Sequence, residues 1–99
     1  MTVNIKINAS KEWLDLLFEY LDKSFNIIFE DYNILLHSFN KYELKTRPDR
    51  QMLIWKFDGL EDKDFDDIFS RINRVVPQAI ECVVSKQLYL YLDEYKEVK

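Results

Sequence analysis

Residues 51–57, QMLIWKF, alternate between two faces in a way that decides the fold class. The apolar side chains of one face alternate with the residues of the other, Leu53, Trp55 and Phe57 against Met52, Ile54 and Lys56. This period of two is typical of a strand deep inside a sheet, because successive side chains of a strand point to opposite faces. We therefore expect the face with Trp55 to lie on the core and the other face to be covered less completely.

The composition is that of one folded domain spanning residues 1–99. Apolar residues make up 47% of the chain and aromatic residues 15%, which excludes intrinsic disorder. A chain of this length can bury one core without metal or disulfide staples. The lone Cys82 can form no internal disulfide; it suits a reducing compartment, or it is simply a small buried apolar side chain. No apolar run approaches the ~20 residues of a membrane span and no signal peptide is visible, so the expected location is the cytoplasm.

Before QMLIWKF, the sequence predicts a strand followed by an amphipathic helix. Residues 2–8 alternate as a half-buried first strand. Ser10 stands at the N-cap of a helix that we expect to run from Lys11 to about Lys23. The inner stripe of this helix has helical spacing and consists of Trp13, Leu14, Leu17, Phe18 and Leu21.

The segment from 25 to 39 leaves two alternatives open. Both of its halves are rich in β-forming side chains, and residues 31–33 between them have turn character. The segment is therefore either a small hairpin or an extended connection into one long strand. Clean alternation resumes at 42–46, and the proline and aspartate of residues 47–50 predict a turn that folds this strand back onto QMLIWKF.

After QMLIWKF, the sequence predicts a second helix and further strands. The helix is expected to begin within Glu61–Asp64 and to stop at Pro77. Its inner stripe consists of Phe65, Ile68, Phe69, Ile72 and Val75 or Val76. Residues 79–84 and 87–92 are expected to form strands, and the charged end, 93–99, is expected to fray.

The order strand, helix, strand, strand, helix, strand predicts an α+β two-layer sandwich of the ferredoxin-like plan (βαββαβ). Right-handed crossovers would put both helices on one face of an antiparallel sheet, with QMLIWKF and residues 2–8 as its central strands. The pattern leaves room for one or two extra strands. This plan hosts many unrelated functions, so it does not define an activity.

Negative charge is concentrated between Asp58 and Asp67. The whole chain carries −4, whereas this segment alone carries −5. Its six acids are Asp58, Glu61, Asp62, Asp64, Asp66 and Asp67. One or two acids suffice to favour a helix start, so the excess predicts a local field that speeds encounter with a cationic surface. The alternatives are plain solubilising charge and a metal loop, and the acids lack the alternating spacing and central glycine of a calcium loop.

No pattern in the sequence supports catalysis, a cofactor or a metal. His37 is the only histidine, and no group that would orient it as an acid or base is evident. One histidine and one cysteine do not make a metal site, and a single glycine excludes the usual phosphate loops. We therefore expect a protein that is not an enzyme. The alternative is a small enzyme that uses His37 with a neighbouring carboxylate.

A basic cluster on the predicted hairpin raises the alternative of a nucleic-acid surface. The cluster consists of Lys41, Lys45, Arg47, Arg50 and Lys56, near the aromatic Tyr42 and Trp55. Aromatic side chains on a sheet stack bases in RNA-recognition domains. The glycine-containing motif of those domains is missing, and the net charge of −4 opposes phosphate binding. We expect no nucleic-acid partner.

The sheet face away from the helices predicts self-association. Met52, Ile54, Tyr89 and Tyr91 would lie together on this face. An apolar patch of that kind, or an exposed edge strand, favours a homodimer. The alternative is that extra strands shield the patch.

These observations favour a non-catalytic binding protein whose acidic surface docks on and neutralises a basic protein partner. In composition the chain resembles small acidic inhibitors, namely immunity proteins that silence a toxin nuclease and viral proteins that block a host factor, although it matches no motif of either group. The expected mechanism is steric occlusion, with carboxylates mimicking the phosphates of a nucleic-acid substrate. The second hypothesis is a homodimeric ferredoxin-like module with a structural or regulatory role, joined through its sheet.

Overall fold

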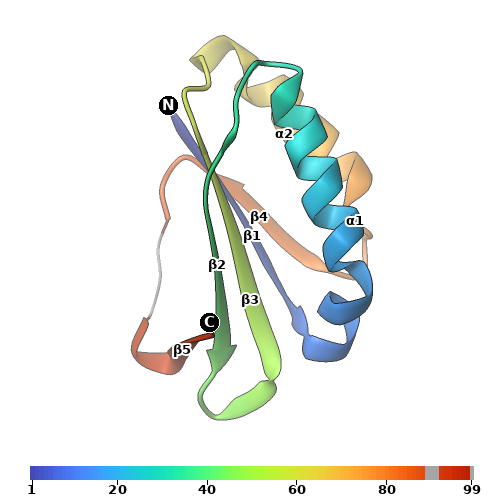
Figure 1. The fold of residues 1–99 in the computed structure, drawn as a ribbon, viewed down its shortest axis with the longest axis vertical. Coiled ribbons are helices and arrows are strands. Elements are labelled where there is room, and N and C mark those ends of the chain that lie inside the picture. Colours follow the sequence, from blue (N-terminus) through green and yellow to red (C-terminus); the bar gives the residue numbers. More distant parts are fainter. Residues whose placement is uncertain (89–91, 99) are drawn as a thin grey trace.

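The computed structural model describes residues 1–88 and 92–98, which form an antiparallel sheet with two helices on one face (Figure 1). The elements are β1 (Thr2–Ser10), α1 (Lys11–Glu30), β2 (Leu36–Leu44), β3 (Arg47–Asp58), α2 (Phe65–Val75), β4 (Glu81–Ser85) and β5 (Tyr95–Val98). Short 3₁₀ helices cover Asp62–Asp64 and Leu92–Glu94. The strands lie in the order β4-β1-β3-β2-β5. The predicted α+β class is confirmed, and the sheet has five strands.

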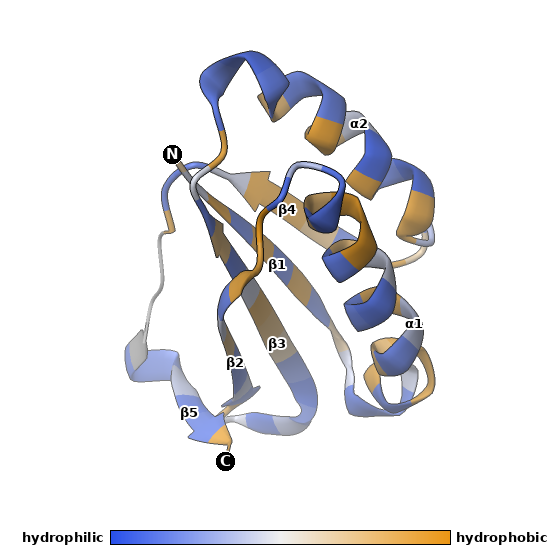
Figure 2. Cartoon of the chain, turned by 45° about the horizontal axis from the view of Figure 1, so that its top comes forward, coloured by the Kyte–Doolittle hydropathy of each residue, from blue (hydrophilic) through white to orange (hydrophobic). Residues whose placement is uncertain are grey.

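The strand β3, which contains QMLIWKF, lies at the centre of the sheet. It pairs antiparallel with β1 from Arg50 to Asp58, with Ile5 opposite Trp55, and with β2 on its other side. Leu53, Trp55 and Phe57 are buried in the core as predicted. In Figure 2 apolar and polar residues alternate along β1, the neighbour of β3. This alternation is why one face of the sheet can be dry while the chain stays in an extended conformation.

An aromatic cluster fills the space between α1 and the sheet. The ring of Trp55 lies 4.9 Å from Phe25, 5.0 Å from Phe39 and 6.0 Å from Phe18, measured between centroids. Its indole N–H donates a hydrogen bond of 2.8 Å to the Asp22 carboxylate. Large aromatic side chains contribute strongly to burial, and the indole donor is satisfied at the same time. The cluster therefore fixes how α1 lies on the sheet.

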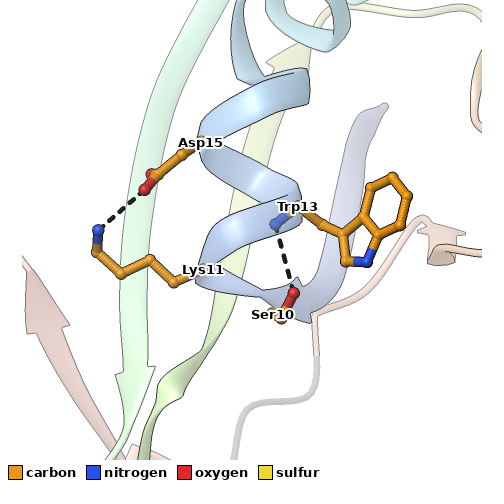
Figure 3. A network of polar contacts seen from close by, with 4 residues as sticks. All are labelled: Ser10, Lys11, Trp13 and Asp15. Atoms are coloured by element: carbon orange, nitrogen blue, oxygen red, sulfur yellow. Dashed lines mark hydrogen bonds and ion pairs between the residues drawn. The ribbon is translucent and has the colours of Figure 1, made fainter.

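The start of α1 follows the prediction. The Ser10 hydroxyl oxygen accepts a hydrogen bond of 3.3 Å from the backbone N–H of Trp13, as an N-cap residue does. One turn later Lys11 and Asp15 form an exposed ion pair of 2.9 Å (Figure 3). The cap satisfies one of the unpaired N–H groups of the first turn, so the helix begins directly after β1.

The end of α1 differs from both alternatives considered for residues 25–39. Residues 25–30 continue the helix, because Phe25, Ile28 and Phe29 extend its buried stripe onto the sheet. Asn33 then adopts a left-handed conformation with φ 60°. The N–H groups of Asn33 and Ile34 donate to the carbonyls of Glu30 and Phe29 at 2.9 and 3.0 Å, the pattern of a Schellman motif. The turn character of 31–33 therefore marks a helix end.

The hairpin between β2 and β3 turns earlier than predicted. Its turn lies at Lys45 and Thr46, and residues 47–50, expected to form the turn, already belong to β3. Leu44 pairs with Arg47 across a register shift. Residues 47–49 extend past the end of β1, so no residue of β1 needs a hydrogen bond from position 48. Proline, which has no backbone N–H to donate, is therefore tolerated at the start of this strand.

The last strand also differs from the prediction. Gln87 lies in a bend and Leu92 begins a 3₁₀ helix, so these residues are not strand, while residues 89–91 lie outside the described part of the chain. The strand is instead β5, in the segment expected to fray. It pairs antiparallel with β2, from Leu44 opposite Tyr95 to Lys41 opposite Val98. The open edge of β2 offers backbone groups that β5 satisfies, which outweighs the charged composition of this segment.

Candidate functional site

The acidic segment lies at one end of the molecule, where β3 gives way to α2 (Figure 1, yellow). Gly59 changes the chain direction there with φ 102°, a conformation that favours glycine. The N–H groups of Gly59 and Leu60 each donate to the Met1 carbonyl at 3.1 Å, and the Leu60 side chain is buried. The backbone that carries the acids is therefore anchored to the sheet and the core.

Asp58 is held by neutral donors. Its carboxylate accepts hydrogen bonds of 3.0 Å from the Thr2 hydroxyl and from the Gly59 N–H. The Thr2 hydrogen bond, with smaller contributions from the Gly59 N–H and the charged N-terminus, lowers the pKa of Asp58 below its ordinary value. Asp58 therefore stays ionised without a bonded cation.

The lysines of the chain cancel only part of the remaining charge. Glu61 lies 3.3 Å from Lys63 and Asp62 lies 3.5 Å from Lys86, and all four side chains are more than half exposed. Exposed pairs of this kind contribute little and leave their charges accessible. Within residues 1–88 and 92–98, Asp64 and Asp66 take part in no ion pair. The negative field at this end is therefore reduced but not neutralised.

The fold brings two acids from outside residues 58–67 to the same end of the molecule. Glu30 and Asp31 end α1 beside the start of α2, because Asp31 pairs with Arg71 at 2.6 Å and the Tyr32 hydroxyl donates to Asp67. The bond to Asp67 raises the pKa of Tyr32, and the bond to Asp31 raises that of Arg71. The sequence holds one signal of this negative charge. The last turn of α1 contains no basic residue, although a base there would interact favourably with the helix dipole. We call the eight acids the acidic end: Glu30, Asp31, Asp58, Glu61, Asp62, Asp64, Asp66 and Asp67.

Two residues of the predicted self-association patch, Met52 and Ile54, do not lie on the surface. Met52 and Ile54 are only 2% and 3% exposed, so the expectation that they form an open apolar face is wrong. The alternative of a shielded face fits better, since Tyr95 of β5 extends its hydroxyl to within 3.4 Å of the Asn8 amide on β1. Tyr89 and Tyr91 lie outside the described residues. Met52 and Ile54 are therefore not accessible to a partner from this face of the sheet.

The basic hairpin does not form one surface. Lys41 lies opposite Leu53 on the helix side of the sheet, whereas Lys56 lies opposite Asn4 on the other side. Trp55 is fully buried and cannot stack on a base. The arrangement that would have supported a nucleic-acid site is therefore missing from the hairpin.

A groove of about 550 Å³ lies between α1 and the β2–β3 hairpin. It is lined by Leu14, Asp15, Leu16, Phe18, Glu19, Phe39, Lys41, Gln51 and Leu53. The Gln51 side chain is buried here, and its Oε1 accepts no hydrogen bond from the described part of the protein. The lining combines apolar walls with two carboxylates and one amine but no histidine or cysteine, so it has the character of a binding surface.

Histidine and cysteine lie apart from one another. His37 is exposed on β2, and Cys82 packs against the core from β4, where burial raises its pKa to about 11. Among residues 1–88 and 92–98, no three His, Cys, Asp or Glu side chains are grouped as a metal site would require. Nor does the described chain contain a helix with the length and apolarity needed to cross a bilayer.

Comparisons with known proteins inform the fold alone. No protein family matches the sequence, and no curated protein matches it. Among solved structures, the chain is similar to a "De novo designed protein Ferredog-Diesel", with 17% sequence identity and a TM-score of 0.53. The similarity covers 87% of this chain and 85% of that chain. At this identity it supports the α+β architecture and carries no statement about activity.

Proposed function

We propose that this protein is a non-catalytic binding protein, and that its acidic end docks on a basic protein partner and neutralises it. One observation carries the proposal. Four of the six predicted acids form no ion pair with a lysine or arginine within the described residues, and the other two form exposed pairs. Chains that need acids only for helix capping use one or two in the first turn. A field maintained at one end of a compact body favours fast encounter with a cationic surface.

The proposed mechanism is occlusion. The acidic end presents carboxylates on an anchored backbone, so they would meet a basic site without a large loss of conformational freedom. The carboxylates of the acidic end would take the place of the phosphates that a nuclease or another nucleic-acid-binding partner normally contacts. Blocking that site requires no chemistry from this chain, which is why we assign no catalytic residue. The single free Cys82 is compatible with a cytoplasmic location, which we include in the proposal.

We further propose that the body is a ferredoxin-like fold extended by one strand. The order β4-β1-β3-β2, read without β5, is compatible with the βαββαβ plan, and β5 then lengthens the sheet at the β2 edge. The likeness to the designed protein supports this interpretation at the level of the fold.

The decisive experiment compares two variants of equal net charge. The first changes Asp62, Asp64, Asp66 and Asp67 to Asn. The matched control changes four exposed acids elsewhere, namely Asp49→Asn, Glu81→Gln, Asp93→Asn and Glu94→Gln. Association rates with candidate basic partners, starting with proteins encoded next to this chain, are measured at about 20 mM and about 500 mM salt.

We expect the first variant to lose about tenfold or more of the association rate at low salt, and most of that difference to vanish at high salt. The control should stay close to the unmodified chain at both salt concentrations. Equal rates for all three proteins would remove the acidic end from the mechanism. A partner whose own activity continues in the complex would contradict occlusion.

A further inference from the structure

The groove between α1 and the β2–β3 hairpin has a hydrogen-bond acceptor in its lining that the described chain does not use. The side chain of Gln51 is 1% exposed, and its Oε1 accepts no hydrogen bond from residues 1–88 and 92–98. Buried side-chain oxygens nearly always have a partner, because an unpaired one has lost its hydration without compensation. A leucine would fill the same position without that cost. The amide of Gln51 therefore points to a ligand that donates a hydrogen bond to it.

The strand register places this acceptor beside an apolar surface. On the helix side of the hairpin, Lys41 lies opposite Leu53, and Gln51 lies two residues nearer the turn. Away from the turn, the rings of Phe18 on α1 and Phe39 on β2 meet edge to face, with centroids 5.3 Å apart. Both rings line the groove. The groove therefore offers a polar acceptor near the hairpin turn and an aromatic wall farther along the strands.

The two sides of the groove carry opposite charges. Asp15 and Glu19 lie one turn apart on α1, and the Asp15 carboxylate points toward the pale green ribbon of β2 (Figure 3). Lys41 faces them from β2. The hydrogen bond from Lys11 is the main cause that lowers the pKa of Asp15, and the charge of Lys41 adds to it from across the groove. Neither Glu19 nor Lys41 forms an ion pair within the described part of the chain.

We propose that this groove binds a small zwitterion, namely a free α-amino acid with an apolar side chain. The ammonium group of the ligand donates to the Gln51 oxygen and to the carboxylates of α1. The carboxylate of the ligand pairs with Lys41, and its side chain packs against Phe18 and Phe39. The groove volume of about 550 Å³ lies within the range of small-molecule sites.

Simpler occupants use only part of this lining. Water meets the need of the Gln51 oxygen but uses neither charged side of the groove. An amine without a carboxylate has a positive charge beside Lys41 and no group to pair with it. A carboxylate without an amine meets the acids of α1 and leaves the Gln51 oxygen without a donor. Only a ligand with both charges matches both sides of the groove.

This site is separate from the acidic end. Gln51 lies in the half of β3 next to the hairpin turn, whereas Asp58 ends the same strand. Docking of a basic protein on the acidic end and binding of an amino acid in the groove therefore involve different residues, and either proposal can fail without the other.

A matched set of ligands tests the proposal. The ligands are L-phenylalanine, phenethylamine, which lacks the carboxylate, and 3-phenylpropionate, which lacks the amine; L-leucine is a second amino acid. Each is titrated into the isotopically labelled full chain up to about 10 mM and followed by NMR. We expect L-phenylalanine or L-leucine to shift the side-chain amide resonances of Gln51. L-phenylalanine should bind about tenfold or more tightly than either analogue.

Two results of the titrations would overturn the proposal. The first is that neither amino acid shifts the Gln51 amide up to about 10 mM. The second is that phenethylamine or 3-phenylpropionate binds as tightly as L-phenylalanine, because the groove would then recognise one charge and not two.

Three variants assign the contacts. Lys41→Met should weaken L-phenylalanine about tenfold without weakening phenethylamine, whereas the control Lys45→Met, at an exposed lysine in the hairpin turn, should change neither. Gln51→Leu should abolish binding without lowering the melting temperature, because it removes the unpaired acceptor. Unchanged affinity in Lys41→Met would overturn the proposal, and so would binding that persists in folded Gln51→Leu.

Discussion

Trp55 is the side chain through which the sheet and the first helix share one core. The alternation of QMLIWKF predicted that it faces inward, and it is fully buried. Its hydrogen bond to Asp22 was not predicted, although Asp22 stands within the predicted helix. The helical pattern assigns Asp22 to the polar side, and only the docking angle of α1 brings it over the indole. Periodicity predicts which face is buried, but it does not predict which polar atom meets which donor.

Replacing Trp55 with Phe should destabilise the protein by about 2 kcal/mol, because the change removes buried volume and the 2.8 Å hydrogen bond from the indole to Asp22. Urea unfolding followed by circular dichroism at low micromolar concentration measures this loss. The control is Trp13→Phe, at a side chain that is 56% exposed, with an expected change within about 0.5 kcal/mol. Equal losses in the two variants would show that Trp55 does not organise the core.

The buried thiol of Cys82 gives a pH dependence with a definite sign. Its pKa in the folded chain is about 11 against an ordinary 9.0, so the folded state holds the proton more tightly. The resulting stabilisation is complete below pH 9 and is lost as the pH rises toward 11. Stability curves of the chain and of Cys82→Ala should therefore converge over this window. Iodoacetamide at pH 8 should modify the native thiol slowly and the unfolded thiol quickly; rapid native modification would contradict the burial.

At the scale of elements, both ends of α1 carried sequence signals, but only one was interpreted correctly. Ser10 predicted the start because a hydroxyl before an amphipathic run has few other roles. At the other end, β-forming residues such as Phe29 suggested extended chain. The Phe29 ring instead lies 3.8 Å from the ring of Phe57, and burial against the sheet outweighs local propensity. Asn33 is compatible with a hairpin turn and with a helix end, so residue type alone could not decide.

The left-handed Asn33 makes this helix end testable. Asn33→Ala should cost about 1 kcal/mol, because alanine resists positive φ, whereas Asn33→Gly should lie within about 0.5 kcal/mol of the original chain. Thermal and urea unfolding of the three proteins provide the comparison. If alanine and glycine behave alike, the closing turn of α1 is not set by this backbone conformation.

At the scale of the molecule, the sequence predicted the layers, the central strands and the acidic segment. It did not predict β5, because four residues with two charged side chains have no strong pattern and become a strand only beside the free edge of β2. In the sheet that β5 extends, Met52 and Ile54 are buried, whereas alternation alone had assigned them to an open face. The acidic end gained Glu30 and Asp31 only when the true length of α1 brought them beside α2.

Removing β5 tests whether this strand protects the edge of the sheet at β2. A chain that ends after Glu94 should lose amide-exchange protection at Lys41–Leu44, whose outward groups pair with β5 in the complete sheet. Protection in β1 should persist, because its partners β3 and β4 remain. Hydrogen exchange followed by NMR resolves the two strands. Unchanged protection at Lys41–Leu44 would show that the pairing with β5 contributes little.

The distance in sequence between β2 and β5 also has a consequence for synthesis. As the chain leaves the ribosome, the β2–β3 hairpin and its neighbours can assemble while β5 is still inside the exit tunnel. During that interval the backbone of β2 is an open template for any extended nascent chain nearby. Slow translation of the segment that follows β4 would therefore prolong a state prone to misassembly, whereas prompt emergence of β5 would seal the sheet.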